Sequence, residues 1–303
     1  MSIALKFFKG LSAFPLTPID AAGNLIEDAL SAFLTRIHDA GADSIGLLGS
    51  TGGYAFLTRE QRRHTVSTAV KCIGGKTPLI VGAGALRTDE AQTLARDAAD
   101  AGADALLLAP VSYTPLTQEE GFQHFKAVAQ ATDLPLCIYN NPSTTHFIFT
   151  IELIERLADI KNIKSIKMPL PADNKHAAEI AKLRAVTPDD FTIGYSGDWG
   201  AKDALLAGAD TFYSVAAGLL PKQFAVLMRV AQSGDKTEAE RINKAFEPLW
   251  SLFKAHGSFR VMYVIADLLD LAKIEPPRPI LPLGEEIRGQ VEAALKALND
   301  LPH

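Results

Sequence analysis

Short apolar runs alternate with longer amphipathic stretches along most of this chain. Runs such as Ala105–Leu108 are apolar throughout, which is typical of strands buried on both faces. The stretches between them have helical spacing, so that Leu30, Phe33 and Ile37 would share one face of a helix. Eight candidate strands lie near 8–14, 44–49, 78–82, 104–109, 135–139, 162–167, 191–194 and 210–214. The pattern predicts a regular alternation of strands and helices.

One junction between a helix and the next strand occurs three times. The sequence Ala-Gly-Ala-Asp precedes an apolar run at 40–43, 101–104 and 207–210. Glycine is favoured just past a helix C-terminus because it accepts positive φ without a Cβ clash. Eight strands in strict alternation with helices predict a closed (β/α)8 TIM barrel rather than an open sheet. We expect the barrel over residues 1–233 and a C-terminal helical extension, packed on it, over 234–303.

Local signals mark where several of these helices begin. The segments Thr58–Gln61 and Thr117–Glu120 match the capping box, in which the first side chain and the fourth bond each other's backbone N–H groups. Thr88 is followed by two acidic residues, so we expect it to be an N-cap with acids in the first turn.

Composition and charge narrow the classes of function. The 303 residues are 48% hydrophobic and 21% charged, and 30 basic against 35 acidic residues give a net charge of −5. Without a block of Lys or Arg we expect neither a nucleic-acid nor a membrane partner. The isolated Cys72 and Cys137 are typical of buried thiols in a reducing compartment. Together with the lack of a signal peptide or a long apolar span, this predicts a cytoplasmic protein.

Three lysines lie in or just before the sixth predicted strand, and only one suits chemistry. Active sites of such barrels lie at the C-terminal ends of the strands. Side chains alternate along a strand, so Ile163, Ser165 and Lys167 should share one face and Lys164 the other. Lys161 precedes the strand. Lys167 alone can point inward at the catalytic rim, where burial favours the neutral amine that a Schiff base requires. The alternative is a solvated rim lysine.

Two further strand ends carry candidate groups. Tyr139 ends the preceding strand, so its phenol could reach toward Lys167 and carry protons, although a core aromatic with a wet tip would fit too. The turn Gly49–Gly53 offers backbone N–H groups and the hydroxyls of Ser50 and Thr51, which suit a carboxylate. An ordinary loop or a phosphate cradle are the alternatives there. The histidines do not converge at ligand-like spacing, so we expect no metal site.

These motifs, in this order and spacing, resemble the dihydrodipicolinate synthase / N-acetylneuraminate lyase family over nearly the whole chain. The matching segments are Phe14–Pro18, Gly49–Gly52, Tyr113–Thr117, Tyr139–Pro142, Ser165–Lys167, Ser196–Asp198 and Ser214–Val215.

The resemblance implies a role for each matching side chain of the catalytic group. It implies that Lys167 forms the Schiff base and that Tyr139 is the general acid/base. Ser50 would relay protons between tyrosines. Tyr113 would be the second tyrosine, reaching in from a neighbouring subunit, which implies a homodimer or homotetramer. No cofactor beyond the covalent imine is implied.

The resemblance also implies a binding set and a reaction. Thr51 would hold the 2-keto acid carboxylate through its hydroxyl and N–H, next to Gly52. Gly197 would line the pocket with its backbone and Tyr213 with its ring. The substrates would be pyruvate or a related 2-keto acid, together with an aldehyde or sugar-acid partner.

Two departures bear on the partner. The family's synthase branch carries an Arg where this chain has Thr144, and a Glu is common where it has Gly53. A bidentate clamp for a carboxylate would be lost. A hydroxylated partner would fit Thr144, Thr145 and Tyr213 better. We therefore expect an aldolase or dehydratase, with 4-hydroxy-tetrahydrodipicolinate synthase as one alternative and a non-catalytic keto-acid-binding or regulatory protein as another.

Overall fold

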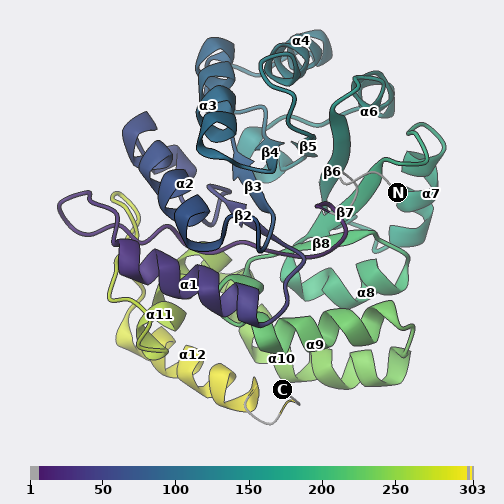
Figure 1. Cartoon of the computed structure of the whole chain (residues 1–303). Coiled ribbons are helices and arrows are strands. Elements are labelled where there is room, and N and C mark those ends of the chain that lie inside the picture. The colour runs from purple at the N-terminus through teal and green to yellow at the C-terminus, as the bar shows by residue number, and fades with distance from the viewer. Residues whose placement is uncertain (1–6, 299–300, 302–303) are drawn as a thin grey trace.

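Eight parallel strands close into a barrel in sequence order in the computed structural model, which describes residues 7–298 and residue 301. The strands are β1 (Gly10–Ala13), β2 (Ser44–Leu47), β3 (Leu79–Gly82), β4 (Ala105–Leu108), β5 (Leu136–Tyr139), β6 (Ile163–Pro169), β7 (Thr192–Ser196) and β8 (Thr211–Ser214). β8 pairs again with β1, which closes the ring (Figure 1). The predicted (β/α)8 fold is confirmed, and every predicted strand overlaps an observed one.

Helices surround the strands (Figure 1). They are α1 (Glu27–Asp39), α2 (Arg59–Ile73), α3 (Thr88–Ala101), α4 (Gln118–Ala129), α5 (Pro142–Thr145), α6 (Ile151–Ala158), α7 (His176–Arg184), α8 (Ala201–Leu206) and α9 (Pro221–Gln232). The chain ends with α10 (Lys236–His256), α11 (Ser258–Leu268) and α12 (Glu285–Leu298). Short 3₁₀ turns are η2 (Tyr54–Phe56), η3 (Asp198–Gly200) and η4 (Ala216–Gly218). α10 packs against α8, α9 and α12.

The helix starts test the capping predictions. Both capping boxes are present, at Thr58 with α2 and at Thr117 with α4. The first turn of α3 contains the predicted acids Asp89 and Glu90, but Thr88 is not the N-cap, because α3 begins at Thr88 itself and Arg87 precedes it without a side-chain cap. The Thr88 hydroxyl instead lies 2.9 Å from Nδ1 of His124 on α4. The Thr88 hydroxyl therefore bonds a side chain of the neighbouring helix and does not cap α3.

The aspartates of the three repeated junctions have one shared task. The carboxylate of Asp43 accepts the N–H of Leu11 at 2.7 Å, and that of Asp104 accepts the N–H of Leu79 at 2.8 Å. Asp210 accepts the N–H of Ile193 at 2.8 Å. Each aspartate thus satisfies a donor at the start of the strand that precedes its own in the barrel. An unpaired backbone donor is costly, which gives the repeat a physical reason.

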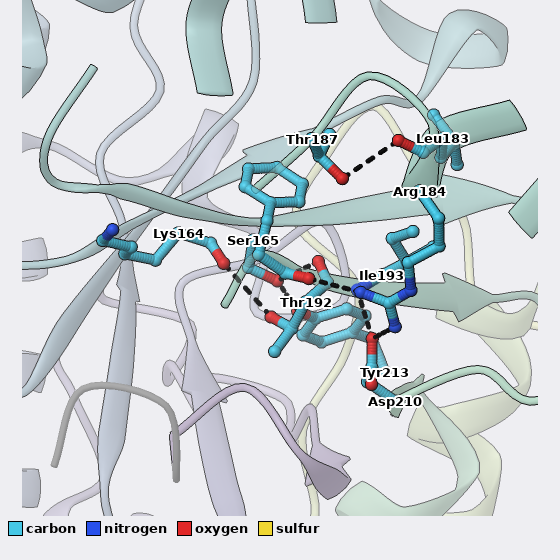
Figure 2. A network of polar contacts seen from close by, with 10 residues as sticks. Lys164, Ser165, Leu183, Arg184, Thr187, Thr192, Ile193, Asp210 and Tyr213 are labelled. Atoms are coloured by element: carbon cyan, nitrogen blue, oxygen red, sulfur yellow. Dashed lines mark hydrogen bonds and ion pairs between the residues drawn. The ribbon is translucent and has the colours of Figure 1, made fainter. Parts of the chain in front are cut away.

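A polar network ties the amino ends of β6, β7 and β8 together (Figure 2). Arg184 of α7 forms an ion pair with Asp210 and donates to the carbonyl of Phe191 at 2.6 Å. Figure 2 shows Ser165 and Tyr213 within the same network, and both side chains are fully buried. The contacts fix β7 and β8 beside β6.

Apolar side chains form two separate layers around the strands. Alternate strand residues join the helices in a large outer core. The others point into the barrel and form a small inner cluster that includes Phe14, Tyr139 and Tyr213. A Cβ on Gly46 would lie 2.2 Å from the Phe14 ring, so the missing side chain of β2 makes room for that ring. The inner cluster fills the interior of the barrel.

The side chain of one β6 residue, Ile163, points to the face opposite to the predicted one. Ile163 packs in the outer core, although strand alternation predicted that it would face inward with Ser165. The register shifts between Leu136 and Cys137 of β5, so that Leu136 pairs with Ile163 and Cys137 pairs with Ser165. The residue between them is extra. Alternation fails across such a bulge because the ladder is locally interrupted.

The two cysteines differ in burial. Cys137 is buried as expected, but Cys72 is half-buried at the contact of α1 with α2, so the prediction of two buried thiols is wrong for Cys72.

Among the described residues, no helix combines the length and the apolar character needed to span a bilayer.

Candidate active site

Lys167 lies at the centre of the candidate site, on the strand beside Tyr139. The two residues are paired in register across β5 and β6. The Lys167 side chain is 4% exposed, and its Nζ lies 4.1 Å from the ring centroid of Phe14 and 4.2 Å from that of Tyr139. The ring of Tyr213 is 5.5 Å away. Aromatic faces attract an ammonium, while burial opposes its charge.

No acid neutralises Lys167 within the part of the chain that the structure describes. The hydrogen bonds and ion pairs of residues 7–298 and 301 include none at its Nζ. Lys164, by contrast, forms an ion pair with Asp190 at 3.1 Å, next to the amino end of β7. A carboxylate partner holds a lysine as the ammonium, so an amine without such a partner more readily loses the proton that blocks its lone pair.

The Tyr139 phenol is held by two side chains. Its Oη lies 3.2 Å from the Ser50 hydroxyl and 3.0 Å from Nδ2 of Asn141. The structure thus brings Lys167, Tyr139 and Ser50 together. Sequence reasoning did not single out Asn141. The second amide of the sequence Tyr-Asn-Asn-Pro was the signal available.

The turn after β2 offers unused backbone donors beside this group. Among the described residues, the N–H groups of Thr51 and Gly52 have no acceptor, and the Thr51 side chain is buried. A Cβ on Gly52 would meet the Leu48 N atom at 3.0 Å, so the turn is too tight for a side chain there. Neighbouring backbone N–H groups that are left free in a tight turn are the donors from which anion sites are built.

The hydroxyl of Tyr213 does not face the catalytic end. Tyr213 is fully buried, and its Oη lies 2.9 Å from Ser165 Oγ and 3.4 Å from Cys137 Sγ. Desolvation raises the pKa of this phenol well above its ordinary value. The expected contact between a substrate and the Tyr213 hydroxyl is therefore wrong, because Ser165 and Cys137 bind that hydroxyl inside the barrel. Only the ring of Tyr213 borders Lys167.

The two threonines after Tyr139 also use their hydroxyls internally. The Thr144 and Thr145 hydroxyls donate to the carbonyl of Asn141, at 3.3 and 3.0 Å. Thr145 is buried, whereas Thr144 is exposed. The expectation that both hydroxyls face a substrate is wrong for Thr145, whose hydroxyl helps to close the turn α5. Thr144 lies on the surface of that turn.

The ends of β7 and β8 are joined by a buried carboxylate. Gly197 has φ of 104°, which a side chain would disfavour, and it packs against Leu170. The next residue, Asp198, is 1% exposed and accepts bonds from Ser214 and from the N–H groups of Val215 and Ala216. Burial raises its pKa, against these donors. Asp198 thus fixes the rim at Gly197.

Tyr113 stands apart from the other candidate residues. Its side chain, on the loop after β4, is 94% exposed. Tyr54, which sequence reasoning did not assign, lies closer to the site: it is half-buried under the guanidinium of Arg62, 5.4 Å from its ring centroid. Burial and the proximity of Tyr139 raise the pKa of Tyr54 to about 12. Tyr54 lies between the turn Gly49–Gly53 and the capping box at Thr58, in a segment for which the sequence analysis made no prediction.

A cavity of about 660 Å³ lies beside the turn after β2. It is lined by Thr17, Gly52 and Gly53 and, on its other side, by the segment 273–278. The C-terminal part of the chain therefore contributes to the surroundings of the catalytic end.

Comparison with known proteins supports a family assignment. The sequence model of the Dihydrodipicolinate synthetase family matches residues 7–298. A 4-hydroxy-tetrahydrodipicolinate synthase from Psychrobacter sp. (strain PRwf-1) is 33% identical over 286 residues, covering 93% of this chain and 92% of that protein. A crystal structure of dihydrodipicolinate synthase from Agrobacterium tumefaciens str. C58 is 59% identical, with a TM-score of 0.96 over 97% of this chain and 99% of that one. A monomeric dihydrodipicolinate synthase variant is 26% identical, with a TM-score of 0.90 over 99% of this chain and 100% of that one.

Proposed function

This chain belongs to the dihydrodipicolinate synthetase family, and from that premise we propose that Lys167 forms an imine with pyruvate or a related 2-keto acid. As a member of this family the chain is an enzyme of the lyase type. The observation that carries the proposal is the buried Lys167 amine, with the Tyr139 ring 4.2 Å away and no carboxylate bound to it among the described residues.

The first half of the proposed reaction makes the imine. The Lys167 amine adds to the C2 carbonyl carbon, and the carbonyl oxygen takes a proton from Tyr139. The Tyr139 phenolate then takes a proton from the nitrogen and passes it to the new hydroxyl, which leaves as water. Ser50, 3.2 Å from Tyr139 Oη, passes protons to and from the phenol. The free N–H groups of Thr51 and Gly52 bind the carboxylate of the keto acid and aim its C2 at the amine.

The second half uses the imine as an electron sink. The Tyr139 phenolate takes a proton from C3, which gives an enamine. The enamine attacks the carbonyl carbon of an aldehyde, and the aldehyde oxygen takes the proton back from Tyr139. Hydrolysis of the new imine frees Lys167. The reverse sequence cleaves a C–C bond. When the keto acid is itself a sugar acid, the enamine formed on it instead expels a neighbouring hydroxyl, which leaves as water with a proton from Tyr139.

We propose further that the partner carries no carboxylate bound at position 144. Thr144 is exposed there, and no Arg occurs from Tyr139 through Glu155. A hydroxylated aldehyde or a sugar acid fits this surface, because neither requires a cationic clamp near Thr144. The names of the relatives favour a second candidate, 4-hydroxy-tetrahydrodipicolinate synthase.

The exposed Tyr113 supports an oligomer. A tyrosine that is 94% exposed on a catalytic-end loop has a large apolar ring in water. We propose that it enters the site of a second copy of the chain, as the family resemblance implies. A structural relative described as monomeric makes the oligomeric state a question for measurement.

The decisive experiment traps the imine. The protein is incubated with pyruvate, reduced with borohydride and mapped by mass spectrometry. We expect an adduct on Lys167 and none on Lys164, its neighbour with an ion pair. No adduct with pyruvate or with a panel of longer 2-keto acids would favour the non-catalytic alternative. Turnover of aspartate semialdehyde above that of hydroxylated aldehydes would favour the synthase.

A further inference from the structure

The Asn141 side chain bonds the group that the proposed reaction protonates and deprotonates. Its Nδ2 atom donates to Tyr139 Oη at 3.0 Å. Among the described residues, the only other hydrogen-bond partner of this phenol is Ser50, at 3.2 Å. A hydroxyl can donate or accept, but an amide N–H can only donate. The Asn141 N–H therefore favours the phenolate form of Tyr139, because a phenolate oxygen accepts hydrogen bonds more strongly than a phenol oxygen does.

The main chain of Asn141 is fixed by the turn that it opens. Its carbonyl accepts the N–H groups of Thr144 and Thr145, at 3.1 and 3.0 Å, in addition to both hydroxyls. Pro142 follows as the first residue of α5, and its ring fixes φ. The amide therefore starts from a rigid position.

Ser143 binds the other end of the same amide. Its hydroxyl donates to Oδ1 of Asn141 at 2.8 Å. With Oδ1 bound to Ser143, the Nδ2 end of the amide faces Tyr139. In this arrangement the amide directs an N–H at the phenol oxygen.

We propose that Asn141, oriented by Ser143, is a positioning residue that holds the Tyr139 phenol beside Lys167 and stabilises its phenolate form for proton transfer. The proposal rests on the proposed function, in which Tyr139 moves protons at the imine. It assigns Asn141 no contact with a substrate.

Other groups around Tyr139 could affect the same proton, and they lie on several elements. Lys167 on β6 lies 4.2 Å from the Tyr139 ring centroid, and Tyr213 on β8 and Cys137 on β5 share the inner cluster with it. Tyr54 on η2 is close enough to interact electrostatically, and Arg62 of α2 covers Tyr54. The Lys167 amine is consumed when the imine forms, whereas the Asn141 amide keeps its place throughout.

The tyrosines of this chain make a direct titration feasible. Burial raises the pKa of Tyr54 and of Tyr263 to about 12. It raises the pKa of Tyr213 well above the ordinary value, and burial beside Glu179 does the same for Tyr195. Burial thus raises the pKa of four of the six tyrosines, and Tyr113 is exposed and can be replaced. In a Tyr113→Phe background, the part of the ultraviolet tyrosinate absorbance that added Tyr139→Phe removes reports Tyr139.

The test compares Asn141→Val, Asn141→Asp, Ser143→Ala and Ser143→Thr in that background, each checked for cooperative thermal unfolding. We expect Asn141→Val to move the tyrosinate midpoint up by about one pH unit, and Asn141→Asp further. Ser143→Ala should move it less, because the amide stays in place without its guide. Ser143→Thr keeps the hydroxyl and should restore the parent midpoint. Ser143 is exposed, so its variants give a result even where a change at Asn141 disturbs folding.

A second readout connects the titration to the reaction. Exchange of the C3 protons of pyruvate with solvent deuterium should show a pH profile that shifts with the midpoint. At pH 7 we expect kcat for exchange to fall about tenfold in Asn141→Val, with KM changed less than about twofold. A midpoint that does not move in Asn141→Val, or moves down in Asn141→Asp, overturns the proposal. So does a moved midpoint with an unmoved exchange profile. The titration needs no substrate, so a failure to trap an imine at Lys167 would count against the proposed function separately.

Discussion

Tyr139 and Lys167 are direct neighbours in the barrel, paired in register across β5 and β6, with the lysine Nζ 4.2 Å from the centre of the tyrosine ring. A phenol and an amine fixed to adjacent parallel strands cannot drift apart without breaking the sheet. The barrel therefore supplies at no further conformational cost the proximity that imine chemistry requires.

Replacing the lysine should separate stability from reactivity. Lys167→Met keeps the length of the side chain and removes a buried amine that has no acidic partner within residues 7–298 and 301. We expect no borohydride-trapped adduct, and a free energy of unfolding that is higher by about 1 kcal/mol. Urea denaturation and mass spectrometry measure the two effects. Lys164→Met is the matched control, since it removes the ion pair with Asp190 and should leave the adduct in place.

Introducing a cation at position 144 should change the order in which the enzyme prefers its aldehyde substrates. In Thr144→Arg, a guanidinium on the exposed face of α5 would bind both oxygens of a carboxylate through two N–H groups. We expect kcat/KM for aspartate semialdehyde to rise about tenfold relative to that for an uncharged hydroxyaldehyde. Thr144→Lys supplies charge without the fork and should gain less. An unchanged ranking in both variants would show that α5 does not border the partner.

The buried hydroxyl of Tyr213 should matter to stability and little to activity. Tyr213→Phe removes the bond to Ser165, whose own hydroxyl still donates to the Thr192 carbonyl at 3.2 Å. We expect a loss of about 1 kcal/mol in the free energy of unfolding and normal trapping at Lys167. A large loss of turnover with stability unchanged would mean that the hydroxyl reaches the substrate after all.

Acid should weaken the contact between α3 and α4. His124 is buried, desolvation lowers its pKa, and its Nε2 has no hydrogen-bond partner among the described residues. The unfolded chain therefore binds a proton more readily than the folded one. Stability is full above the ordinary His value near 6.5 and is lost as the pH falls below it.

The measurement is the urea midpoint at pH 7.5 and at pH 5.5. It should fall on acidification in the parent protein and fall less in His124→Gln, which keeps a polar side chain near Thr88 and cannot titrate. His64→Gln, at an exposed position paired with Glu27, serves as the control. Equal falls in all three proteins would assign the acid sensitivity to other groups.

Local patterns in the sequence determined the architecture. The (β/α)8 barrel could be predicted from three features: apolar runs of strand length, helical spacing between them and the repeated Ala-Gly-Ala-Asp junction. Each of these features depends only on residues that are close together in the sequence. The capping boxes at Thr58 and Thr117 are equally local and are present. Strand alternation also predicted Lys167 on the inner face, where its Nζ lies among the rings of the inner cluster.

The tertiary structure decided which partner each polar side chain takes. Thr88 bonds His124 instead of capping its helix, the Tyr213 hydroxyl turns to Ser165, and Asn141 turns to Tyr139. The bulge that sends Ile163 outward likewise arises between two strands. A hydroxyl or an amide has several bonds of nearly equal strength available, so the choice among them depends on distant segments that meet only when the barrel closes. Periodicity along the chain carries no information about that meeting.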